Sequence, residues 1–130
     1  MIRALVILLA VLVAGLPACG NKEEEHALIP PQYWKEMVVR IEPHPNPPLA
    51  GMSEIVVIVT GARGRPVHDL IISLRSNDRA PWVQTIQDGH IGVYRRGVSL
   101  GFGETAVLQV LLQQGKEQQV LLFPLKLAAG

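Results

Sequence analysis

Short runs of β-branched residues, separated by glycine and proline turn signals, set the strongest limit on what this chain can fold into. Residues 54–60 contain five valine or isoleucine side chains and a threonine, and residues 61–66 then supply a turn with two glycines and a proline. β-Branched side chains are enriched in strands because they pack well on a pleated surface. The sequence therefore predicts a domain built from strands.

The same pattern recurs along the chain. We expect seven strands, at residues 37–42, 54–60, 67–76, 82–87, 91–98, 105–113 and 118–127. Gly92 and Gly97 predict bulges in the fifth strand, and Pro124, which lacks a backbone donor, predicts a sheet edge or a bulge for the last. Residues 105–113 could also mark a helical face, but a short apolar run bounded by glycines favours a buried strand. Seven such strands fit an all-β, immunoglobulin-like β-sandwich.

The N-terminal residues are organised like a secretory signal. Arg3 gives a charged start, residues 4–16 are apolar, and Leu16-Pro17-Ala18-Cys19 ends the segment. This ending resembles the lipobox of bacterial lipoproteins, which implies cleavage before Cys19 and acylation of its thiol. Two alternatives are an ordinary signal cleaved near Ala18 and a spanning helix. Thirteen apolar residues are too few to span, because a bilayer core needs about 20.

These segments divide the chain into a signal peptide with a signal helix at residues 1–18, a lipidated, disordered tether at residues 19–33, and one sandwich domain at residues 34–128. A cysteine that carries two or three acyl chains is a stable membrane anchor. In Gram-negative lipoproteins an aspartate after the cysteine commonly signals retention in the inner membrane, and this chain has Gly20. The resemblance therefore implies an outer-membrane lipoprotein that faces the periplasm, or the outer side of the cytoplasmic membrane in a host with one membrane.

Composition excludes several classes of function. The chain has 12 Lys plus Arg and 11 Asp plus Glu, so loss of Arg3 with the signal leaves 11 of each and no overall field that would capture nucleic acid. Cys19 is the only cysteine, which leaves no internal disulfide. The sequence has no nucleophile elbow, zinc-protease motif or phosphate-binding loop, so we expect neither an enzyme nor a cofactor.

Arginine is concentrated in the middle of the chain. Residues 63–96 hold six arginines against three aspartates. Arginine and tryptophan are favoured at the centres of protein interfaces. We therefore expect an envelope protein to bind at Arg79 and Trp82 in an exposed loop, together with Arg95 and Arg96. The simpler alternative is that these residues only solvate strand faces and loops.

The mature domain also resembles the YtkA-like and FixH-like secreted immunoglobulin-like domains, over about residues 44–127. The resemblance is carried by Pro48-Leu49-Ala50-Gly51, Gly64-Arg65-Pro66-Val67 and Gly92-Val93-Tyr94. It implies an alternative function in periplasmic copper handling or in respiratory-oxidase assembly. Copper favours methionine and histidine ligands. The first candidates are His44, Met52 and His90, and the others are His26, Met37 and His68. No two of them lie at a compact ligand spacing, and each alone is more often a surface histidine or a packing methionine, so we expect no metal site from these residues themselves.

Overall fold

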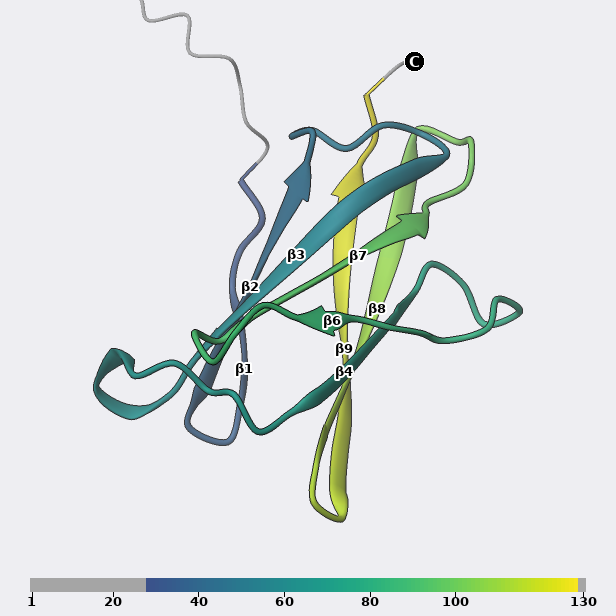
Figure 1. Cartoon of the computed structure of the whole chain (residues 1–130). Helices are drawn as coiled ribbons and strands as arrows, with labels where there is room; N and C mark the ends of the chain where they lie inside the picture. The colour runs from purple at the N-terminus through teal and green to yellow at the C-terminus, as the bar shows by residue number, and fades with distance from the viewer. Residues whose placement is uncertain (1–27, 129–130) are drawn as a thin grey trace, which may run out of the picture.

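Two antiparallel sheets form the part of the chain that the computed structural model describes, residues 28–128 (Figure 1). The first sheet has the order β1 (Gln32–Trp34), β2 (Met37–His44), β3 (Met52–Thr60), β7 (Val93–Ser99) and β6 (Ile86–Gln87). The second has the order β5 (Val83–Gln84), β4 (Ile71–Arg75), β8 (Thr105–Gln114) and β9 (Glu117–Lys126). A single 3-10 turn, η1 (Ala62–Gly64), is the only helical element within these residues.

The strand order is that of an immunoglobulin sandwich. If β2, β3, β4, β6, β7, β8 and β9 are lettered A to G, the first sheet reads A-B-E-D and the second reads C-F-G. β1 and β5 add one edge strand to each sheet. The expected all-β sandwich is confirmed. Between residues 28 and 128 the chain has no helix long and apolar enough to cross a membrane.

Alternation of buried and exposed side chains explains why these residues form paired sheets. In β9, for example, every second residue from Leu121 to Leu125 is buried and the residues between them face outward. The buried rows of both sheets meet in one core, whose largest members are Tyr94 and Phe123. Burial raises the pKa of the Tyr94 hydroxyl, which donates a hydrogen bond of 2.8 Å to the carbonyl of Val67.

The strand expected at residues 82–87 is divided between the two sheets. β5 pairs with β4, β6 pairs with β7, and Thr85 lies between them. Thr85 is buried, and both its backbone N–H and its hydroxyl donate to the carbonyl of Ile72 at 2.8 Å. The chain therefore switches sheets at Thr85, and this leaves β6 only two residues long.

Smaller differences from the expected pattern concern the ends of strands. β1 includes Gln32 and Tyr33, so ordered structure begins inside the segment assigned to the tether. β4 begins at Ile71 rather than at residue 67. The register of β3 with β7 runs without interruption through Gly97, so the bulge predicted there is wrong. Pro124 lies on β9, which is an edge strand as predicted. The signal peptide and Cys19 lie outside the described residues.

Gly92 is required where the turn before β7 meets the segment after β3. Its φ is 78°, and a Cβ there would lie 2.6 Å from the carbonyl oxygen of Val59 and 3.1 Å from Pro66. Gly92→Ala should lower the free energy of unfolding by about 2 to 4 kcal/mol, through backbone strain and a forced shift of β3. Urea denaturation measures this. The matched control is Gly115→Ala, which has a φ of 61° but open space around it and should cost about 1 kcal/mol. Equal losses in the two variants would contradict the close contact.

Candidate functional site

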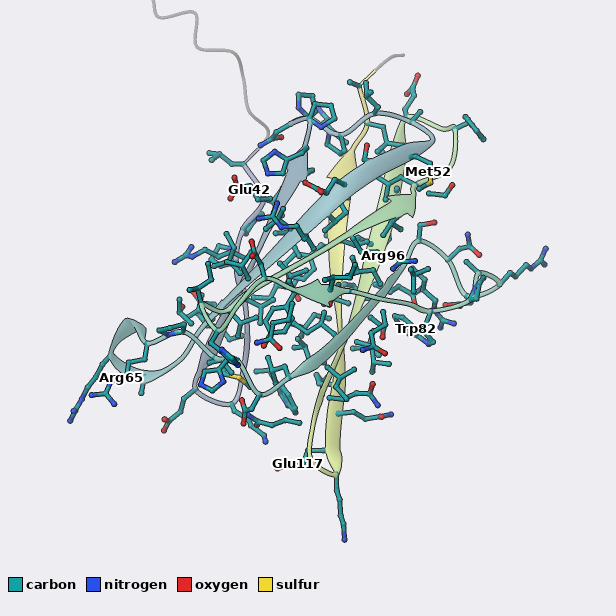
Figure 2. All side chains as sticks on the ribbon, viewed as in Figure 1. Glu42, Met52, Arg65, Trp82, Arg96 and Glu117 are labelled. Carbon is teal, nitrogen blue, oxygen red and sulfur yellow. The ribbon has the colours of Figure 1, made fainter. Side chains whose placement is uncertain are left out.

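The arginines and the tryptophan expected at an interface lie on two segments. Arg79 and Trp82 belong to the connection between β4 and β5, and Arg95 and Arg96 belong to β7. Figure 2 shows Trp82 and Arg96 on the same side of the molecule as Met52, with Arg65 on the opposite side. The structure therefore brings the loop and one half of β7 together.

Arg75, which the sequence did not single out, holds this loop in place. Its guanidinium carbon lies 4.1 Å from the centre of the Trp82 ring, and its Nε donates to Oε1 of Gln109 at 2.9 Å. Asp78 accepts a hydrogen bond of 2.8 Å from the same Gln109 and lies 3.6 Å from Nη2 of Arg75. Trp82 is therefore half-buried against Arg75 rather than a free loop anchor.

Arg79 lies at the tip of the same loop. Its backbone N–H donates to the side-chain oxygen of Asn77 at 2.9 Å, and the N–H of Ala80 donates to the Asn77 carbonyl at 3.2 Å. Asparagine forms such local turns readily. The turn leaves the Arg79 side chain exposed, with no ion pair to another described residue.

The outer edge of β7 is open over half of its length. The N–H of Val59 donates to the carbonyl of Gly92, and the N–H of Leu100 donates to the carbonyl of Gly51. With the register of the two strands, this means that the even-numbered residues of β7 direct their N–H and C=O groups toward β3. The odd-numbered residues direct theirs away from β3, and β6 reaches no further along β7 than Arg95. The N–H and C=O groups of Gly97 and Ser99 therefore face away from β3, on a side where no strand of residues 28–128 pairs with them.

A groove lies beside this open edge. Its volume is about 360 Å³, and its lining is mostly apolar, with Met52, Pro81 and Val83 among its walls and Arg75 and Arg96 as its cations. Arg96 pairs with the buried Ile55, so it occupies a core-facing position of β7, yet its side chain is exposed. Among the described residues it forms no ion pair.

Arg95 has a different role from Arg96. Its guanidinium lies 3.0 Å from Asp88 and 3.8 Å from Glu54, so its charge is already paired on the outward face of the first sheet. Of the four residues expected to bind a partner, Arg96 lines the groove and Arg79 and Trp82 belong to the loop beside it, whereas Arg95 does not line it.

A larger hollow, of about 690 Å³, lies at another part of the surface and is less suited to binding. Lys35 reaches it from the β1–β2 turn but pairs with Glu117 at 2.7 Å and with Gln114 at 3.0 Å. Gln114 also donates to both oxygens of Asp69, at 3.2 Å each. Lys35, Gln114 and Asp69 are therefore already engaged with one another or with Glu117.

The three first metal candidates do not come together. His44 ends β2 and lies 3.6 Å from Glu42, and Met52 begins β3. His90 precedes β7, whose first residue pairs with Ile58 near the opposite end of β3. At about 3.3 Å per residue, the length of β3 places His90 more than about 20 Å from Met52. Within residues 28–128 no three His, Cys, Asp or Glu side chains are grouped to hold a metal ion. The ring that His90 does contact is that of His68, with ring centres 5.2 Å apart.

Comparisons of the chain with protein-family models, curated proteins and solved structures give no match. The open edge of β7 and its groove are therefore the features from which a function can be inferred.

The contact between Arg75 and Trp82 should be measurable by a double-mutant cycle. We expect Arg75→Ala and Trp82→Ala to show a coupling energy of about 0.5 to 1 kcal/mol, because a cation over an indole ring is stabilising at a partly exposed site. The free energies of unfolding of the two single variants and the double variant give this value. Arg79 and Trp82 form the control pair, with expected coupling near zero. Equal coupling in the two pairs would contradict the stacking.

Proposed function

We propose that this chain is a membrane-anchored, non-catalytic binding module of the cell envelope, which binds an extended segment of a protein partner along the open edge of β7. One observation supports the proposal above others. β6 pairs with only two residues of β7, and no strand of the described residues pairs with the outward backbone groups of Gly97 and Ser99, which can therefore accept another strand. Addition of a strand to an exposed sheet edge is a common mode of peptide recognition.

The groove indicates the chemistry of the segment. Gly97 and Ser99 offer two donors and two acceptors, and each net hydrogen bond contributes about 0.5 to 1.5 kcal/mol. Arg96, unpaired among the described residues and beside this edge, favours a carboxylate on the bound strand. Met52, Pro81 and Val83 offer apolar contact for the side chains between. We therefore infer an extended segment that carries acidic and apolar residues.

A lipid anchor complements a binding edge of this size. Four backbone hydrogen bonds and one ion pair give only moderate affinity once the cost of association is included. Attachment through an acylated Cys19 would hold the domain on the membrane that carries its partner and raise their effective concentration. For a Gram-negative host we propose the outer membrane, facing the periplasm.

Photo-crosslinking tests the edge in cells. A benzophenone amino acid in place of Met52, which is exposed in the groove, should crosslink to one discrete partner. Arg96→Glu should abolish the crosslink by charge reversal. Gly97→Pro should also abolish it, because proline removes an outward N–H that the β3 ladder does not use. Mass spectrometry of the crosslinked product measures both effects.

The control for charge is Arg65→Glu, because Arg65 is exposed on the opposite side of the molecule (Figure 2). It should leave the crosslink intact. Circular dichroism of Gly97→Pro shows whether the fold survives the substitution. A crosslink that persists in both folded edge variants, or that disappears equally in Arg65→Glu, would refute binding at this edge.

The anchor has its own test. Cys19→Ser removes the thiol that would be acylated, so the protein should no longer incorporate a radiolabelled fatty acid and should leave the membrane fraction or accumulate as a precursor. Wild-type protein is the reference, and membrane fractionation with immunoblotting gives the distribution. Unchanged labelling and unchanged membrane association in Cys19→Ser would rule out the lipid anchor and leave the β7 edge untouched.

A further inference from the structure

The rings of His68 and His90 lie against each other although they are 22 positions apart in the sequence. Their centres are 5.2 Å apart and their planes meet at 85°. Both side chains are exposed. His68 follows β3 and His90 follows β6, and neither strand brings the two together by direct pairing. We propose that this pair is a binding site for a divalent transition-metal ion.

The backbone on both sides of the pair is firmly held. The carbonyl of His68 accepts a hydrogen bond of 2.9 Å from the side chain of Gln87. The preceding Val67 donates to the carbonyl of Val59 at 3.1 Å and accepts from the buried Tyr94 hydroxyl at 2.8 Å. These bonds fix the position of the His68 backbone relative to β3, β6 and β7.

The second histidine is fixed through Gly92. A Cβ at this position would lie 3.1 Å from Pro66, so the absence of a side chain lets the two segments approach closely. Asp88 donates its N–H to the carbonyl of Val93 at 2.8 Å, which closes the turn that carries His90. The two histidines are therefore presented from segments in fixed contact, and only their side-chain torsions are free to adjust.

The separation of the rings suits one shared ion. A nitrogen–metal bond of about 2.0 to 2.1 Å puts each imidazole centre about 3.2 Å from the ion, so two adjacent ligands have centres about 4.5 to 5.2 Å apart. Rotation of the exposed rings can turn one nitrogen of each toward a common point. No third protein ligand of the His, Cys, Asp or Glu type joins them among residues 28–128. The site would therefore keep open positions for water or for a ligand from another molecule.

A pair of imidazole ligands favours some metal ions over others. Imidazole suits copper, zinc and nickel, and calcium and magnesium prefer oxygen ligands. By the general order of divalent affinities, Cu²⁺ should bind more tightly than Zn²⁺. The site lies beyond the start of β7, about 20 Å along the strand from Gly97 and Ser99. It is therefore independent of the proposed binding edge, and either can fail without the other.

The test uses the full chain in detergent with competing ligands removed. The chain has four histidines and one cysteine, so the variant His26→Gln, His44→Gln, Cys19→Ser retains only His68 and His90 as strong ligands. Titration with Cu²⁺ should show one saturable site, and electron paramagnetic resonance should show coupling to two equatorial nitrogens from imidazole. Zn²⁺ should compete more weakly for the same site.

Further removal of either histidine decides the outcome. His68→Gln or His90→Gln in this background should lower the Cu²⁺ affinity by about tenfold or more and leave coupling to one imidazole. Circular dichroism should be unchanged, because both side chains are exposed. Absence of stoichiometric Cu²⁺ binding in the background variant, or equal affinity with and without either histidine, would overturn the proposal.

Discussion

The two hydrogen bonds from Thr85 to the carbonyl of Ile72 determine how the rest of this surface is built. They hold the chain at the point where it leaves the second sheet and enters the first. β5 and β6 must share the few residues from Val83 to Gln87, so neither can cover its neighbour fully. The open half of β7 follows from this sharing, and the groove beside it follows from the loop that leads into β5.

An open strand edge that binds a partner must also be protected from unwanted pairing with other strands. Natural sheets limit unwanted pairing with short strands, proline and inward-pointing charges. Arg96 occupies a core-facing position at the margin of the sheet, and Gly97 beside it leaves the backbone accessible. One charge at the edge disfavours pairing with an apolar strand and favours an acidic one. Specificity and solubility therefore depend on the same side chain.

The sequence predicted much of the fold because alternation and turn residues are local signals. Residues 105–113 and Pro124 were placed correctly for that reason. The division of residues 82–87 could not be predicted, because this segment contains no glycine or proline to mark a break. Only the Ile72 carbonyl, distant in sequence, explains the change of sheet. A bulge was predicted at Gly97 because glycine inside a strand often marks one, and this prediction was wrong. An unpaired sheet edge, which is what Gly97 occupies, leaves no local signal in the sequence.

Prediction of the candidate sites requires tertiary contacts even more than prediction of the fold does. Trp82 and Arg96 were recognisable by residue type, but Arg75 becomes relevant only through its stacking on Trp82. His90 was considered with His44 and Met52, and the strand register separates it from Met52 and places it beside His68. Residue type identified candidates in each case. Which of them share a site depended on the register and on the close contact at Gly92.

Amide hydrogen exchange along β7 tests the central claim most directly. In the free protein, the N–H groups of Gly97 and Ser99 should exchange rapidly, while those of Arg96 and Val98, which face β3, should be strongly protected. Residue-resolved exchange by nuclear magnetic resonance separates these neighbours under one condition and in one sample. Protection of Gly97 and Ser99 equal to that of Val98 would show that the edge is already covered and would contradict an open binding strand.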